Sequence, residues 1–258
     1  RKSMRARGYS PFGASEKQDK VLDQIVGLAE GGTVGVFDLD GCLFDSRYRQ
    51  VVIFHSFASR HGILELFQVN IEHFIDWDMK RPMRLVGLSE QKIEKIFPAF
   101  LKFWHARFFT DKWVSKDHAM PGARELVQAC YDRGMYVVYL TGRDDNMRLG
   151  TEEGLRIFGL PYDRERTLLV TKPQSTELDE DYKINELKEI SKLGDLRFLI
   201  DNEPINVNMF QEHHPEALVV WIETDHSPRN IFPAEGITRI RSFYRTDWPK
   251  SFEDTPVQ

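Results

Sequence analysis

Apolar segments of strand length alternate with amphipathic helical segments along most of this chain. We expect helices at residues 121–131, 151–158, 183–193 and 205–212, because their apolar residues recur on one face. Short apolar runs, typical of buried strands, are found at residues 33–40, 135–141, 167–171, 196–200 and 217–223. This order predicts an α/β fold with a Rossmann-like, doubly wound parallel sheet. Ligands of such folds bind beyond the carboxyl ends of the strands.

The segment 47–117 interrupts the alternation. It contains several helical patterns and no convincing strand, with a helix cap expected at Ser89 and a kink at Pro98. It also holds 9 of the 18 Phe and 3 of the 5 Trp residues of the chain. We therefore predict an inserted α-helical cap subdomain, whose aromatic residues mostly form its own small core.

The two ends of the chain frame this core. Residues 1–32 are predicted to form an N-terminal extension and an entry helix, with Ser15 and Gln18 as a capping box. The catalytic core is then assigned to residues 33–46 and 118–258. A strand is expected at 237–243, followed by a polar end that we expect to be loosely ordered.

Composition narrows the class of protein. Two cysteines, Cys42 and Cys130, are too few for a disulfide framework and lack the spacing of a zinc site. No apolar run has the length of a membrane span, and no signal-peptide pattern is evident, so we expect a cytoplasmic protein without membrane contact. The oligomeric state cannot be read from the sequence.

The most informative motif follows the first strand. It reads Asp38-Leu39-Asp40-Gly41, and two carboxylates at one strand end repel each other unless a cation or a proton lies between them. We interpret Asp38 as a nucleophile for a phosphoryl group and Asp40 as the general acid/base, whose task would be helped by burial that raises its pKa. Taken alone, the same residues also form an ordinary turn.

Three further strand ends carry polar residues. Thr141-Gly142-Arg143 offers a hydroxyl and backbone N–H groups for phosphoryl oxygens. Either Lys183 or Lys172 could neutralise the charge of the phosphate. Asp201 would complete a Mg²⁺ site with Asp38 and Asp40, since hard cations prefer oxygen ligands, and Asn202 or Glu203 could orient a metal-bound water.

Four such segments, in this order and each at a predicted strand end, support one another. The sequence resembles the haloacid dehalogenase superfamily of phosphatases, whose four motifs match Asp38-x-Asp40, Thr141, a lysine and Asp201. The resemblance implies a helical cap inserted after the first motif, Mg²⁺ as cofactor, and phosphoryl transfer through Asp38. The spacing of Tyr182-Lys183 before Leu187 resembles the branch of polynucleotide 3′-phosphatase domains and acid phosphatases, which favours Lys183 over Lys172.

These observations lead to one main prediction and two alternatives. The main prediction is a magnesium-dependent phosphomonoesterase that hydrolyses a small phosphorylated metabolite. Because residues 47–117 carry a net charge of +4 within a chain of −5, a phosphatase acting on nucleic-acid ends is the first alternative, although a solvated helical surface explains the same charge. The second is a non-catalytic binding protein, since Asp201 is followed by Asn202 and Glu203 rather than by further aspartates.

Overall fold

The computed structural model describes residues 10–173 and 178–248. Its central element is a six-stranded sheet with the order β5-β4-β1-β6-β7-β8, in which every neighbouring pair is parallel. The strands are β1 (Thr33–Phe37), β4 (Tyr136–Asp144), β5 (Thr167–Lys172), β6 (Asp195–Asp201), β7 (Leu218–Ile222) and β8 (Thr238–Ile240). The predicted Rossmann-like α/β fold is confirmed.

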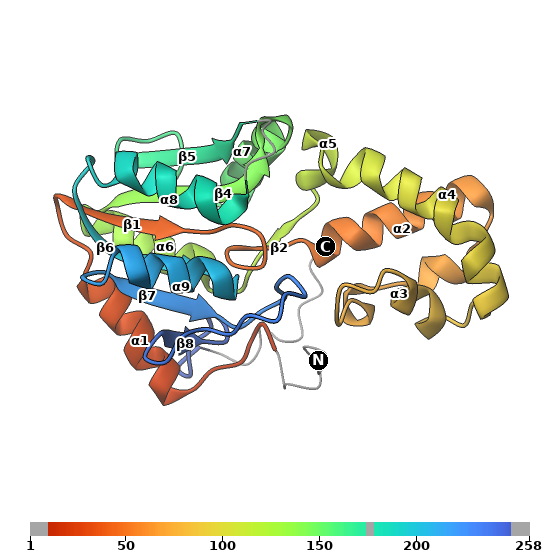
Figure 1. The fold of residues 1–258 in the computed structure, drawn as a ribbon, viewed down its shortest axis with the longest axis horizontal. Helices are drawn as coiled ribbons and strands as arrows, with labels where there is room; N and C mark the ends of the chain where they lie inside the picture. Colours follow the sequence, from red (N-terminus) through yellow and green to blue (C-terminus); the bar gives the residue numbers. More distant parts are fainter. Residues whose placement is uncertain (1–9, 174–177, 249–258) are drawn as a thin grey trace.

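Helices cover both faces of the sheet (Figure 1). The helices concerned are α1 (Glu16–Gly27), α6 (Ala123–Asp132), α7 (Arg148–Ile157), α8 (Asp179–Ile190) and α9 (Pro204–His213). The buried residues of α1, α6 and α7 share one apolar cluster with β1 and β4, and those of α8 and α9 share a second cluster on the other face. The sheet is thus the middle of three layers, which explains why its strands read as continuous apolar runs.

A helical subdomain is inserted between β2 (Phe44–Asp45) and β3 (His118–Ala119), two short strands that pair antiparallel. Its elements are α2 (Arg47–His61), η2 (Leu64–Gln68), η3 (Ile71–His73), α3 (Lys80–Leu85), α4 (Glu90–Phe108) and α5 (Asp111–Val114). They enclose a third apolar cluster of their own, which includes Phe54, Phe57 and Phe100. We call the segment 47–117 the cap; its exact boundaries stay a prediction.

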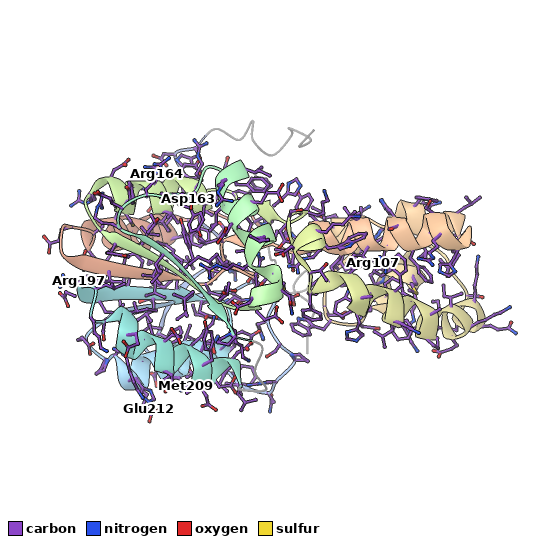
Figure 2. The ribbon with its side chains drawn as sticks, turned by 90° about the horizontal axis from the view of Figure 1, so that it is seen from above. Arg107, Asp163, Arg164, Arg197, Met209 and Glu212 are labelled. Carbon is purple, nitrogen blue, oxygen red and sulfur yellow. The ribbon has the colours of Figure 1, made fainter. Side chains whose placement is uncertain are left out.

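The cap lies beside one end of the sheet (Figures 1 and 2). In Figure 2, Arg107 on α4 marks the cap, whereas Arg197, two residues after the start of β6, lies at the end of the sheet remote from it. The carboxyl ends of the strands therefore face the cap. No helix among the described residues is both long and apolar enough to cross a membrane.

One local prediction, the capping box of Ser15 and Gln18, needs correction. Ser15 caps α1 by accepting a hydrogen bond from the Gln18 backbone N–H, but the Gln18 side chain does not complete a capping box. It is buried and donates instead to the backbone carbonyl of Tyr244 at 2.7 Å and to Ser242 Oγ at 3.1 Å. This contact packs the chain next to the end of the predicted strand 237–243 against the entry helix. Residues 249–258 lie outside the described part.

Candidate active site

Two carboxylates and one ammonium group meet where β1 and β6 end. Asp38 directly follows β1, Asp201 is the last residue of β6, and Lys183 lies in the second turn of α8. Lys183 Nζ donates to Asp38 Oδ1 at 2.6 Å and to Asp201 Oδ2 at 2.7 Å. Residues more than 140 positions apart in the sequence are thus brought together, because neighbouring parallel strands end at the same edge of the sheet.

Burial controls the charges of this cluster. The side chains of Lys183, Asp38 and Asp201 are 3%, 7% and 1% exposed. Burial raises the pKa of Asp38 to about 8, with a further contribution from the nearby Asp201 carboxylate and opposition from the Lys183 ammonium. Burial alone would lower the pKa of Lys183, but the two carboxylates outweigh it and raise that pKa.

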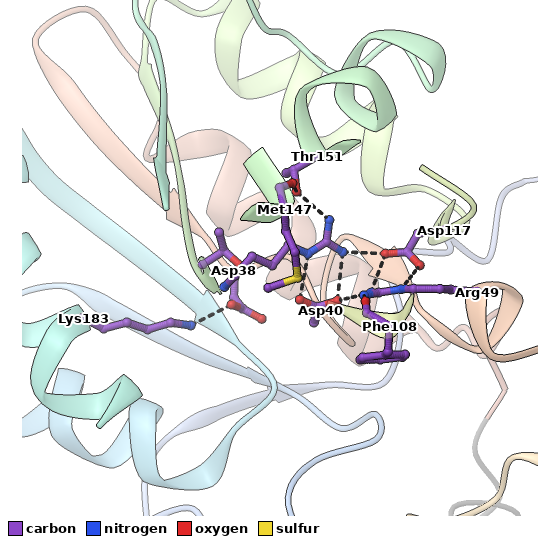
Figure 3. A network of polar contacts seen from close by, with 10 residues as sticks. Asp38, Asp40, Arg49, Phe108, Asp117, Met147, Thr151 and Lys183 are labelled. Atoms are coloured by element: carbon purple, nitrogen blue, oxygen red, sulfur yellow. Dashed lines mark hydrogen bonds and ion pairs between the residues drawn. The ribbon is translucent and has the colours of Figure 1, made fainter. Parts of the chain in front are cut away.

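The Asp40 side chain is bound by two arginines and not by Lys183. Its carboxylate accepts two hydrogen bonds from Arg143, both at 2.8 Å, and one from Arg49 at 3.1 Å (Figure 3). Burial favours the neutral acid, but the two guanidinium groups prevail and lower the pKa of Asp40. The prediction that burial raises the pKa of Asp40 is therefore wrong, because the sequence gave no sign of two arginines at this carboxylate.

The segment Thr141-Gly142-Arg143 belongs to β4 rather than to a turn after it. The Thr141 side chain is fully buried, and its Oγ1 accepts a hydrogen bond from the Arg143 backbone N–H at 3.1 Å. Gly142 and Arg143 line the cavity described below. The Arg143 guanidinium, however, is bound to Asp40, Asp117 and Thr151 and is not presented as a free anion-binding group.

The two candidate lysines have different surroundings. Lys172, the last residue of β5, forms an ion pair with Asp179 at 2.8 Å. Lys183 bridges Asp38 and Asp201, as described above. The geometry therefore places Lys183, and not Lys172, beside the predicted nucleophile.

The polar residues at and after the end of β6 have different hydrogen-bond partners. Asp201 accepts hydrogen bonds from the Glu203 backbone N–H at 2.8 Å and from Asn206 Nδ2 at 3.0 Å. Glu203 turns away and accepts from the backbone N–H and the hydroxyl of Ser227, both at 2.7 Å. Asn202 donates to the backbone carbonyl of Asp225. Asn202 and Glu203 thus fix the loop around the site, while both line its cavity.

A cavity of about 270 Å³ lies between the strand ends and the cap. Its floor includes Asp38, Asp40 and Lys183, and the cap contributes Trp77, Phe108 and Phe109. The Trp77 indole N–H donates to Asp225 Oδ1 at 2.9 Å, which joins the cap to the loop after β7. A cavity lined by both charged groups and aromatic side chains is typical of a small-molecule site.

Comparison with known proteins agrees with this geometry. Residues 101–199 match the family model of the HAD superfamily, subfamily IIIB (acid phosphatase). The predicted resemblance to the haloacid dehalogenase (HAD) superfamily is confirmed over this segment. The matched family is one of acid phosphatases, and the prediction of a phosphatase-type hydrolase is confirmed. None of the curated proteins matches the chain in sequence.

Two solved structures illustrate the similarity of the fold. A HAD-superfamily hydrolase of subfamily IA, variant 1, from Geobacter sulfurreducens PCA is 16% identical, with a TM-score of 0.53, over 83% of this chain and 94% of that protein. Protein tyrosine kinase A from Mycobacterium tuberculosis is 17% identical, with a TM-score of 0.51, over 83% and 94% of the two chains. At this level of identity, the likeness shows the fold alone.

The HAD fold raises the question of a divalent cation. Within the described residues, no group of three or more His, Cys, Asp or Glu side chains is arranged to hold a metal ion. The predicted set of Asp38, Asp40 and Asp201 is incomplete in this respect, because Arg143 and Arg49 hold the Asp40 carboxylate elsewhere. Asp38 and Asp201, in contrast, lie close enough together to bind the same Lys183 ammonium group.

Three residues at this site were not identified from the sequence. Arg49 and Asp117 are buried and bind each other across 68 positions, for which no local pattern exists. Trp77 was counted among the aromatic residues of the cap core, yet it is 56% exposed and lines the cavity. Its neighbours Asp76 and Asp78 are a polar context that could have marked it as a surface residue.

Proposed function

We propose that this HAD protein is a magnesium-dependent phosphomonoesterase that forms an aspartyl-phosphate on Asp38. The observation that carries the proposal is the position of Lys183, whose ammonium group joins Asp38 to Asp201 at the floor of the cavity. A phosphate dianion bound there would meet a fixed positive charge next to a carboxylate oxygen.

The residues present allow a balanced two-step reaction. In the first step, an Asp38 oxygen attacks phosphorus and the bond from phosphorus to the ester oxygen breaks, with Asp40 supplying the proton to the leaving oxygen. A bound phosphate dianion would favour the protonated form of Asp40, because a like charge disfavours the carboxylate. In the second step, water attacks phosphorus, Asp40 takes its proton, and the bond to Asp38 breaks to release inorganic phosphate.

Magnesium suits the donors at this site. Mg²⁺ is commonly held by one or two carboxylates, with water and substrate phosphate completing its shell. Asp38 and Asp201 would supply the two carboxylates. Asn206 also lines the cavity, and its buried Oδ1, for which no hydrogen-bond partner is found among the described residues, would be a further oxygen donor. When bound, the ion would neutralise charge on the transferring phosphoryl group.

The size of the cavity supports a small substrate. About 270 Å³ is just below the range for small-molecule sites, roughly 300–1,000 Å³. Trp77, Phe108 and Phe109 line it from the cap, and a cap that closes over the substrate would limit the entry of water during the first step. A small phosphorylated metabolite is the substrate class that this space supports best.

The test compares two identical substitutions at opposite ends of the sheet. Asp38→Asn should lower the hydrolysis of 4-nitrophenyl phosphate by at least about a thousandfold, since the nucleophile is lost. Asp195→Asn, at the start of β6 and remote from the cavity, should retain wild-type activity. Removal of divalent ions with a chelator should abolish activity, and added magnesium should restore it. Full activity of Asp38→Asn would overturn the proposal.

A further inference from the structure

Arg49 links the cap to the predicted acid/base. It lies in α2, the first helix of the cap, and its side chain is 1% exposed. Its Nη2 donates to Asp40 Oδ1 at 3.1 Å, and its Nε and Nη2 donate to the two carboxylate oxygens of Asp117, both at 2.8 Å (Figure 3). One guanidinium group therefore contacts both carboxylates.

Arg143 contacts the same two carboxylates from the core. Its Nη2 donates to Asp117 Oδ2 at 2.6 Å and to Asp40 Oδ1 at 2.8 Å. Its remaining donors reach Asp40 Oδ2 at 2.8 Å and Thr151 Oγ1 at 3.0 Å. Asp117 is thus a buried bridge between the arginine of the cap and the arginine of the core. The four side chains balance two positive charges against two negative ones.

The four residues come from separate chain segments that converge at the base of the cap. Arg49 follows the outgoing strand β2, and Asp117 directly precedes the returning strand β3. Arg49 Nη1 also donates to the backbone carbonyl of Phe108, the last residue of α4, at 2.7 Å. Both connections of the cap therefore contact the network that holds Asp40. A displacement at the base of the cap would move the donors of this carboxylate.

We propose that Arg49 and Asp117 are positioning residues that orient the Asp40 carboxylate for proton transfer to the leaving oxygen. The inference rests on the proposed function, since it gives Asp40 a proton to deliver. Arg143 donates hydrogen bonds to both carboxylate oxygens of Asp40. Arg49, in the first helix of the cap, supplies a third contact to Asp40. Asp117 binds both guanidinium groups and thereby aligns them. Without Arg49, the Asp40 carboxyl group loses one of the charges that lower its pKa, and it also loses part of what fixes its direction. Without Asp117, the two guanidinium groups lose the carboxylate that aligns them.

Two substrates separate this role from a purely structural one. Phenolate is a more basic leaving group than 4-nitrophenolate, so phenyl phosphate depends more on a well-placed acid. The ratio of kcat/KM for the two esters reports on the first step, because kcat/KM covers the reaction up to the transfer of the phosphoryl group. In Arg49→Gln, we expect kcat/KM for phenyl phosphate to fall at least about tenfold more than that for 4-nitrophenyl phosphate.

Two further variants make the result robust to misfolding. Arg49→Lys keeps the charge but lacks the fork that reaches both carboxylates, so its ratio should lie between those of wild type and Arg49→Gln. Asp117→Asn should shift the ratio in the same direction as Arg49→Gln. The control is Gln18→Ala, which removes buried hydrogen bonds far from the cavity and should lower stability while the ratio stays at the wild-type value.

The outcomes distinguish the two proposals. If wild type hydrolyses both esters and the variants lose both in equal proportion, the two residues only support folding, and the inference is wrong while the proposed function stands. If wild-type protein with magnesium hydrolyses neither ester, the proposed function fails and the inference fails with it. A selective loss on phenyl phosphate that Arg49→Lys partly restores supports the inference.

Discussion

Lys183→Met offers a direct test of the charge cluster at the floor of the site. The substitution keeps most of the side-chain volume but removes the positive charge that two buried carboxylates share. Loss of one partner from a buried ion pair typically costs about 3–5 kcal/mol of folding free energy. Asp201 keeps hydrogen bonds from Glu203 N–H and Asn206, and Asp38 can take up a proton. We therefore expect a loss of about 3 kcal/mol, at the lower end of that range.

The measurement is urea-induced unfolding followed by circular dichroism. With a denaturant slope of about 3 kcal/mol/M, the midpoint should fall by about 1 M. The matched control is Lys172→Met, because Lys172 pairs with Asp179, whose side chain is 57% exposed, and such pairs contribute up to about 1 kcal/mol. If Lys183→Met shifts the midpoint no more than Lys172→Met does, the ammonium does not stabilise the carboxylate pair, and the reasoning is wrong.

Magnesium adds a second arm to this experiment. If Asp38 and Asp201 hold a divalent cation, magnesium at about a hundred times its dissociation constant should return roughly 2.7 kcal/mol to the variant. The readout is the unfolding midpoint, so the result does not depend on catalysis. The same midpoint with and without magnesium would argue against these two carboxylates as its ligands.

Three further predictions concern single groups. Burial raises the pKa of Asp225 from 3.8 to about 7, so its contribution to stability is complete at low pH and is lost as pH rises between these two values. Asp225→Asn should therefore flatten the fall in the urea midpoint between about pH 4 and pH 7, and an unchanged pH profile would contradict this. Burial also raises the pKa of Cys130 to about 12 and that of Cys42 well above its usual value, so native protein should resist thiol alkylation at pH 8, with both thiols reacting in urea. Gly41 has a φ of +71°, and an added Cβ would lie 2.3 Å from Asn202 Nδ2. Gly41→Ala should therefore lower the free energy of unfolding by about 2 kcal/mol or more. A urea midpoint equal to that of wild type would refute the expected strain.

The sequence was sufficient for the layers of the fold. The apolar runs at 33–40 and 196–200 contain or overlap β1 and β6, because strands buried on both faces must be apolar throughout. Alternation with amphipathic helices then requires parallel pairing. The ends of elements were less certain: α8 begins at Asp179, four residues before the predicted start at Lys183, since the helical period does not mark the first turn.

The part of the site that could be predicted from the sequence consists of acidic residues at the ends of apolar strands. Asp38 and Asp201 follow apolar runs, and the fold brings such ends together. The network around Asp40 was not predictable, because Arg49 and Asp117 are neighbours only after the two connections of the cap meet. Their charges look like solvated surface charges in the sequence. Long-range pairing of this kind depends on packing, which local patterns do not encode.

The central claim is that Asp38 carries the phosphoryl group during turnover. It is tested most directly by acid quenching of the protein during hydrolysis of 4-nitrophenyl phosphate, followed by proteolysis and mass spectrometry. The account predicts one phosphoryl group on the peptide that contains Asp38, and none on the corresponding peptide of Asp38→Asn. A phosphoryl group on a different residue, or steady hydrolysis by Asp38→Asn, would contradict it.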